Sequence, residues 1–106
     1  MYLQQLFLLG RATKDAEISE SKSGKQYAKF SLAVNEYLGG KGKEAKEKTY
    51  FYNILVFNKS LTRTDKIKKG DLVMVDGRPE VDPYISNEGE AKASMVVYAN
   101  RWKLLK

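Results

Sequence analysis

Cysteine and histidine are both absent from this sequence of 106 residues. Without cysteine there are no disulfide bonds, thiolate metal sites or thiol nucleophiles. Without histidine the chain lacks the commonest metal ligand and the commonest general base at neutral pH. Serine and cysteine triads and zinc hydrolase sites are therefore excluded, which leaves a carboxylate enzyme, a lysine-based enzyme or a binding protein. We expect no metal and no other cofactor.

Long apolar segments are missing as well. No run approaches the roughly 20 residues that a membrane-spanning helix needs. The apolar residues 1–9 lack the positively charged start of a signal peptide and are too short for one. These absences predict a soluble, cytoplasmic protein without a membrane partner.

Basic residues outnumber acidic ones, with 19 Lys and Arg against 13 Asp and Glu and a formal net charge of +6. This balance favours a polyanionic partner, although many solvated surfaces are equally basic. The carboxylates are scattered without a close pair, so a two-carboxylate hydrolase or a metal site is poorly supported. A hydrophobic content of 42% supports a packed core, and the length predicts one domain over residues 1–106.

The clearest pattern is an alternation of apolar and polar side chains over residues 26–37. Ala28, Phe30 and Leu32 fall on one parity, with polar or aromatic residues between them. This period of two predicts a half-buried strand.

Residues 49–58 are the most β-prone stretch, because they are rich in Tyr, Phe, Ile and Val. If Ile54 and Val56 fill the core, the other parity faces outward. Phe51 and Phe57 belong to that second parity, and two exposed phenylalanines on one surface require a reason.

The remaining segments predict an all-β protein. Further strands are expected over residues 3–12, 16–21, 71–78 and 93–105. Gly10 is expected to bend or bulge the first of them, and Pro79 to mark an edge or a bulge. Loops are expected over residues 38–48 and 82–92, and a short helix or turn over residues 59–69.

This order of elements is that of the OB-fold, a five-stranded Greek-key barrel with one short helix between strands 3 and 4. Small β-barrels of the SH3 type share much of the order. The pattern therefore favours the OB-fold without separating the two completely.

Several sequence blocks, taken in order, indicate a family. They are residues 8–17 (LLGRATKDAE), 23–25 (SGK), 28–36 (AKFSLAVNE), 49–59 (TYFYNILVFNK), 69–73 (KGDLV), 75–78 (VDGR) and Gly89. Together they cover nearly the whole chain, and they resemble the bacterial single-stranded DNA-binding (SSB) proteins. The resemblance implies an OB-fold that binds single-stranded DNA without sequence preference and protects it during replication, recombination and repair. It also implies a location at the bacterial nucleoid or in a phage-infected cell.

In this family aromatic side chains project from the barrel and its loops, and DNA bases stack on them. The matching positions are Tyr37, Phe51, Phe57 and Tyr84, where the family usually has tryptophan at the first, second and fourth. Flat rings suit unpaired bases because every base offers a π-face. Tyr27 is a further candidate. The alternative is that such rings belong to the core or to a subunit interface, which applies most to Phe57; Trp102 is expected to pack against the barrel or another subunit.

Cations that follow the phosphates are the second requirement of such a site. The candidate basic residues are Arg11, Lys14, Lys29, Lys41, Lys43, Lys46, Lys48, Lys59, Arg78 and Lys92. Lys29 shares its strand parity with Tyr27 and Tyr37, which places charge between rings. Any one of these residues can be an ordinary solvated side chain. Together they should make binding salt-dependent, because each neutralised phosphate releases counterions.

The chain also departs from typical family members. These continue beyond the barrel into a flexible linker and an acidic tip that recruits replication and repair enzymes, whereas this sequence ends in the basic Leu104-Leu105-Lys106. An acidic tip was either removed or never present, so recruitment through it is not expected from these residues. A tail-less form also resembles primosomal proteins of the PriB type. Replication or repair proteins stay among the expected partners.

Assembly and ligand choice leave alternatives. Many family members are homotetramers in which the first strands pair, and the apolar residues 1–9 are suited to such an edge. We therefore expect a homo-oligomer, either a dimer or a tetramer. Single-stranded DNA is the leading ligand, while an OB domain that prefers RNA and an adaptor that binds proteins stay open. An enzyme is disfavoured by the missing histidine and cysteine.

Overall fold

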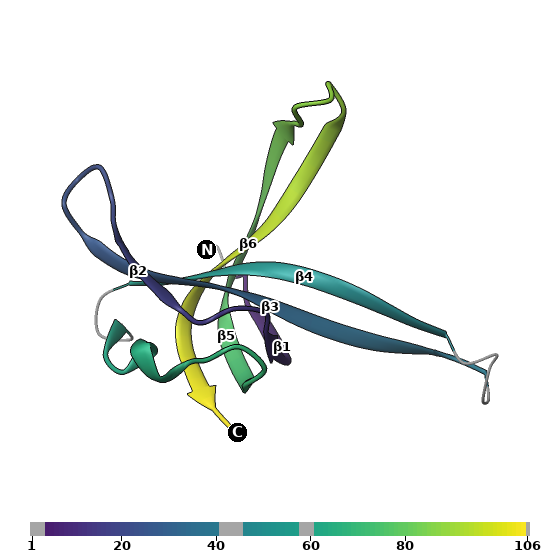
Figure 1. Ribbon diagram of the computed structural model, residues 1–106, viewed down its shortest axis with the longest axis horizontal. Helices are drawn as coiled ribbons and strands as arrows, with labels where there is room; N and C mark the ends of the chain where they lie inside the picture. The colour runs from purple at the N-terminus through teal and green to yellow at the C-terminus, as the bar shows by residue number, and fades with distance from the viewer. Residues whose placement is uncertain (1–3, 41–45, 58–60, 106) are drawn as a thin grey trace.

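The computed structural model describes residues 4–40, 46–57 and 61–105. Its elements are β1 (Leu6–Ala12), β2 (Glu17–Glu20), β3 (Gln26–Gly39), β4 (Lys46–Phe57), the 3-10 turn η3 (Thr64–Lys66), β5 (Leu72–Ile85) and β6 (Ala91–Leu104). The strands follow the order β1-β5-β6-β4-β3-β2, and β1 also pairs with β3. That extra pairing closes five strands into a barrel, with β2 added on the outside of β3. The predicted all-β barrel is confirmed (Figure 1).

Closure of the barrel depends on Gly10 in β1. This strand pairs with β5 from Leu6 to Arg11 and reaches β3 through Arg11 and Ala12. A Cβ atom at Gly10 would lie 2.4 Å from the carbonyl oxygen of Ala33. Only glycine therefore allows β1 to pass this close to β3.

The core is filled by the parity that the alternation predicted. Ala28, Phe30 and Leu32 of β3 are buried, and so are Ile54 and Val56 of β4. Leu8, Ala12, Ile67, Val73, Val75 and Val97 complete the buried cluster. Burial of one face leaves the alternate residues of β3 and β4 on the outside, because successive side chains of a strand point to opposite faces.

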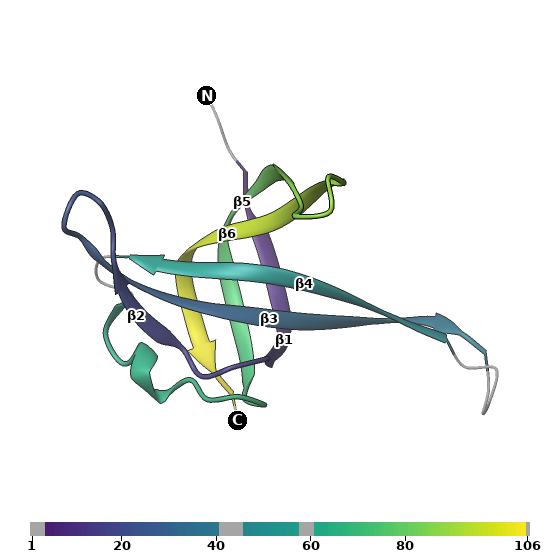
Figure 2. The same ribbon diagram turned by 45° about the horizontal axis from the view of Figure 1, so that its top comes forward.

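Both long hairpins extend further than predicted. The loop expected over residues 38–48 is shortened, because β3 continues to Gly39 and β4 begins at Lys46. The loop expected over residues 82–92 is likewise shortened by the ends of β5 and β6. Glycine and lysine indicate loops in an isolated sequence, but a directly opposed partner strand keeps such residues extended. Figures 1 and 2 show the two hairpins leaving the barrel in different directions.

These projecting hairpins enlarge the molecule. The radius of gyration is 15.3 Å, against about 13 Å for a compact chain of this length. Both faces of each hairpin are therefore exposed where it extends beyond the barrel.

Pro79 does not interrupt its strand, and the edge expected there explains why. In the part of the chain that the structure describes, the pairing of β1 with β5 ends at Leu6 and Gly77, and the rest of β5 pairs with β6 alone. Pro79 lies opposite Val97, and Pro83 lies four residues further along the same open edge. A missing backbone N–H is tolerated on an edge that has no partner.

A bulge in β6 changes which side chains face the core. Asp76 pairs with Arg101 while the next residue, Gly77, pairs with Ala99, so Asn100 is the extra residue. Val97 is buried before the bulge, and Trp102 packs against the core after it, with the parity inverted.

The expected helix is reduced to the 3-10 turn of η3, which follows β4 and precedes β5. Leu61 and Ile67 still anchor this connection, since Leu61 is partly buried and Ile67 is fully buried. Thr64 is also buried, and its hydroxyl donates to the Leu61 carbonyl oxygen at 2.9 Å. With only two apolar anchors, six residues apart, a longer helix would have no apolar stripe to bury.

Candidate nucleic-acid interface

The outward parity of β3 and β4 brings several predicted residues onto one surface. Tyr27 lies opposite Phe57, Lys29 opposite Leu55, and Ala33 opposite Phe51. Paired residues of neighbouring strands share a face, and this face is the one opposite the buried side chains. Phe51 is exposed and Phe57 is half-buried, so both lie outside the core.

The same surface continues across β6 and β5. Leu55 pairs with Tyr98 of β6, and Tyr98 pairs in turn with Arg78 of β5. Further along the hairpin Tyr84 lies opposite Lys92 in the same register. We call this surface the aromatic face, and its members are Tyr27, Lys29, Phe51, Phe57, Arg78, Tyr84, Lys92 and Tyr98.

Three rings and a guanidinium form a row across the aromatic face. The ring centroids of Tyr27 and Phe57 are 5.2 Å apart with an interplanar angle of 24°. Those of Phe57 and Tyr98 are 6.3 Å apart at 29°. The Arg78 guanidinium carbon lies 4.8 Å from the Tyr98 ring centroid. The row crosses β3, β4, β6 and β5 in turn.

Tyr98 was missed by the sequence analysis. It lies in the run Met95-Val96-Val97-Tyr98-Ala99, in which apolar residues fall on both parities. Alternation alone therefore does not say which side of the strand faces out. The orientation follows from the parallel pairing with β4, which joins segments far apart in the chain.

The other predicted rings stand apart from this row. Phe51 pairs with Ala33 near the middle of the barrel, and Tyr84 lies near the tip of the β5–β6 hairpin. Tyr37 is exposed on the outward parity of β3, close to the tip of the other hairpin, where its hydroxyl donates to the Gly40 carbonyl oxygen. The rings are thus spread along both projecting ribbons.

Basic residues lie beside the aromatic face. Lys14 and Lys29 line a hollow of about 350 Å³ together with Ser31 and Asn53, although Glu17 and two further acidic or polar neighbours share it. Arg11 pairs with Ala33 at the closure of the barrel, and its guanidinium donates to the Gly70 carbonyl oxygen at 2.9 Å. These residues place positive charge beside the part of β3 and β4 that carries Phe51.

Not every predicted cation is placed with this surface. Lys48 lies on the other face of β4, where its ammonium is 5.0 Å from the Tyr50 ring centroid. Lys41, Lys43 and Lys59 lie outside the described residues. Lys46 begins β4, but its side chain is likewise not described.

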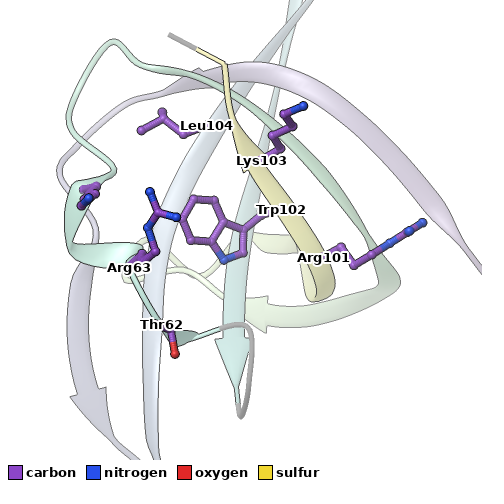
Figure 3. Close-up of a pocket in the computed structure, with 7 residues that line it drawn as sticks. Thr62, Arg63, Arg101, Trp102, Lys103 and Leu104 are labelled. Carbon is purple, nitrogen blue, oxygen red and sulfur yellow. The ribbon is translucent and has the colours of Figure 1, made fainter.

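Trp102 lies away from the aromatic face, beyond the bulge of β6. It lines a cavity of about 560 Å³ with residues of the connection before β5, among them Thr62 and Arg63. Figure 3 shows its indole directed toward Arg63, while Arg101 extends away from the ring. The expectation that Trp102 packs against the barrel is confirmed by its contact with the core.

A second surface lies on the outside of β1 and β5. Phe7, Leu9 and Met74 are exposed there, with Leu9 directly opposite Met74. Beside them the Asp76 carboxylate is buried and accepts hydrogen bonds from Gln5 at 2.8 Å and from Arg101 at 2.7 Å. The Gln5 and Arg101 hydrogen bonds hold the pKa of Asp76 below its ordinary value.

Two features are absent from the part of the chain that the structure describes. None of its helical segments has the length and apolarity to cross a membrane. In residues 4–40, 46–57 and 61–105 no group of three acidic side chains is placed to hold a metal ion.

The sequence is similar to those of several known proteins. The model of the Single-strand binding protein family matches residues 3–105. The chain is 37% identical over 90 residues to Single-stranded DNA-binding protein 1 of Staphylococcus aureus, a match that covers 83% of this chain and 56% of the relative. It is 33% identical over 99 residues to the Single-stranded DNA-binding protein of Thermus thermophilus, covering 93% of this chain and 36% of the relative. The chain thus spans about half the length of the first relative and about a third of the second.

Two solved structures share the architecture. The crystal structure of a small single-stranded DNA-binding protein from Streptomyces coelicolor has a TM-score of 0.82 at 19% identity and covers 99% of this chain and 96% of its own. A Plasmodium falciparum SSB in complex with ssDNA has a TM-score of 0.72 at 26% identity and covers 100% of this chain and 97% of its own. At 19% identity, the Streptomyces coelicolor structure supports the assignment of the OB-fold and nothing further. Because the family model matches nearly every residue and the barrel has the family's architecture, the chain belongs to the single-strand binding protein family.

Proposed function

We propose that this chain binds single-stranded DNA without sequence preference and coats strands exposed during replication, recombination and repair. The proposal rests above all on the aromatic face, one continuous surface that carries outward rings and cations across four strands. The relatives named as single-stranded DNA-binding proteins, and the neighbour in complex with ssDNA, support the same ligand. The named relatives are bacterial, which favours action at a nucleoid or in a phage-infected cell.

The chemistry of the aromatic face suits unpaired nucleotides. Each base that stacks on a ring contributes about 1–3 kcal/mol, and every base has a face to stack. Lys29, Arg78 and Lys92 lie among these rings on the same surface. Stacking therefore supplies sequence-tolerant affinity, and the cations supply a term that weakens as salt rises. Such a site binds and releases its ligand unchanged, as a binding protein does.

We further propose that the chain forms a homo-oligomer through β1. The edge of β1 that faces away from β5 pairs with β3 only at Arg11 and Ala12, so Leu6–Leu9 has no second strand partner in the described structure. Phe7, Leu9 and Met74 expose apolar surface beside that edge. An open edge next to an apolar patch favours pairing with a second copy.

The proposed ligand is tested by titrating fluorescein-labelled oligo-dT at two salt concentrations and following the anisotropy. Tight binding that weakens at high salt, with oligo-U binding more weakly, supports DNA as the ligand. Replacing Lys29 with Ala should lower the slope of log affinity against log salt by about 0.7. Lys66→Ala is the matched control, because Lys66 of η3 lines the cavity beside Trp102 and is not part of the aromatic face. Failure of the wild-type protein to bind oligo-dT at low salt would refute the proposal.

A further inference from the structure

The two ring pairs of the aromatic row differ in spacing. Tyr27 and Phe57 are in direct offset contact, with centroids 5.2 Å apart. Phe57 and Tyr98 are separated by 6.3 Å, near the upper end of the range for aromatic pairs. Carbon atoms in contact lie about 3.5 Å apart, so a flat base held between two rings needs about 7 Å. Both ring pairs are stacked, but Phe57 and Tyr98 are the more widely spaced pair, so they would have to part less than Tyr27 and Phe57 to admit a base.

Tyr98 is supported on the side away from Phe57. The Arg78 guanidinium lies over its ring at 4.8 Å, and Arg78 is itself turned toward the Glu80 carboxylate at 3.6 Å. Both members of this ion pair are substantially exposed, so the guanidinium is open to a phosphate. Because a cation covers one face of Tyr98, a base can stack only on the face toward Phe57, once the two rings part.

We propose that one nucleobase inserts between Phe57 and Tyr98, and that Arg78, behind Tyr98, binds the neighbouring phosphate. Tyr98 thereby becomes a DNA-contacting residue, and Phe57 contributes as half of a slot. This inference rests on the proposed function and makes it more specific. It distinguishes Phe57 from Phe51, which lies opposite Ala33 with no ring facing it across β3.

A simpler reading is that the row only stabilises the sheet, since cross-strand aromatic pairs contribute to folding. The two readings differ in what happens to base binding. A slot needs both rings at once, so removal of either ring should abolish the same contact. If the row is purely structural, removal of a ring should lower stability and should not affect oligo-dT more than an abasic oligomer.

The test is a double-mutant cycle on Phe57→Ala and Tyr98→Ala with two ligands, labelled oligo-dT and an abasic oligomer of equal length. Each single variant should lose about 5- to 150-fold in affinity for oligo-dT, and the double variant should lose little more than either single variant. Affinity for the abasic oligomer should stay near that of the wild-type protein. Arg78→Gln should instead weaken both ligands and lower the salt slope by about 0.7.

Tyr50→Ala is the matched control, because Tyr50 also lies beside a cation, Lys48, but on the other face of β4. It should leave oligo-dT affinity unchanged. Urea unfolding of each variant reports folding separately, and Tyr98→Leu replaces Tyr98→Ala if the latter does not fold.

Three results would overturn the slot. They are wild-type affinity of Tyr98→Ala for oligo-dT, fully additive losses in the double variant, and equal losses for oligo-dT and the abasic oligomer. Each leaves oligo-dT binding by the wild-type protein intact and so refutes the slot alone. Absence of oligo-dT binding by the wild-type protein would instead refute the proposed function beneath it.

Discussion

Two phenylalanines on neighbouring strands show how the surroundings of a residue decide its role. Phe51 of β4 is 62% exposed, whereas Phe30 of β3 is 3% exposed and contacts the barrel core. We therefore expect the same side chain to contribute to DNA binding in one place and to folding in the other. Truncation of Phe51 should therefore change mainly the free energy of DNA binding, and truncation of Phe30 mainly the free energy of unfolding.

Replacing Phe51 with Ala should weaken oligo-dT binding by about 1–3 kcal/mol, because one stacking surface is removed. The melting temperature should change little, since an exposed ring is lost. Phe30→Ala is the control and should lower stability by about 3–5 kcal/mol through a core cavity. Anisotropy titration and thermal unfolding of both variants provide the measurements. A large fall in the melting temperature of Phe51→Ala would contradict its assignment to the surface.

The carboxyl of Asp76 should make stability depend on pH. Its pKa is lowered from 3.8 by the Gln5 and Arg101 hydrogen bonds. The charged form therefore stabilises the fold above the unfolded pKa, and this contribution is lost as the pH falls through the lowered folded value. We expect Asp76→Asn to unfold at lower urea than the wild-type protein at pH 7, with the difference shrinking below about pH 4.

Urea midpoints of Asp76→Asn and the wild-type protein at several pH values measure this difference. The exposed Asp82 offers a control substitution to Asn, for which no such loss is expected at neutral pH. A gap between Asp76→Asn and the wild-type protein that stays constant down to acidic pH would show that the carboxylate charge has no part in it.

At the level of strands, the alternation of apolar and polar residues was enough to predict which side chains of β3 and β4 face outward. It was not enough for the β5–β6 hairpin. The buried parity is visible in the sequence at Leu32 of β3 and at Ile54 of β4. It places Tyr27 and Phe51 correctly on the outside. Tyr98 depends on pairing with β4 and on a bulge at Asn100, and neither leaves a local pattern. The length of both hairpins was underestimated for the same reason, since only a partner strand keeps those residues extended.

The bend of β5 and β6 predicts an unequal response of two glycines. A Cβ atom at Gly77 would lie 2.4 Å from the Tyr98 carbonyl oxygen and 2.9 Å from the Ala99 Cα atom. These are backbone atoms, which cannot move aside easily. Overpacking lowers stability by about 1–3 kcal/mol, and Gly77→Ala should lie at the upper end of that range. Gly89 has a φ of +81° but open space around it, so Gly89→Ala should cost only about 1–2 kcal/mol. Thermal unfolding compares the two, and an equal cost would mean that the close approach at Gly77 relaxes freely.

At the scale of the whole molecule, we expect two exterior surfaces to have different tasks. The aromatic face covers β3, β4, β6 and the projecting part of β5, while the apolar patch of Phe7, Leu9 and Met74 lies on β1 and the barrel part of β5. A homo-oligomer built on the second surface would leave the first open. Several aromatic faces could then serve one long strand of DNA, and linked sites raise overall avidity.

Replacing Leu9 with Lys should therefore reduce the mass in solution, because a charge is placed in the proposed subunit contact. Leu9 is 53% exposed, and Ile18 of β2 is similarly exposed at 49%, so Ile18→Lys is a matched control. Multi-angle light scattering should give a smaller particle for Leu9→Lys only. An unchanged mass for both variants, or an equal decrease, would place the subunit contact elsewhere.

The open edge of β5 beyond Gly77 has a consequence for solubility. Both prolines of the chain, Pro79 and Pro83, lie on this stretch. Four residues apart in a strand, their nitrogens face the same side, and β6 occupies the other side. An approaching foreign strand would find two donors missing from the ladder that it needs. The long hairpin can therefore reach out from the barrel with little tendency to start fibrous or edge-to-edge aggregates.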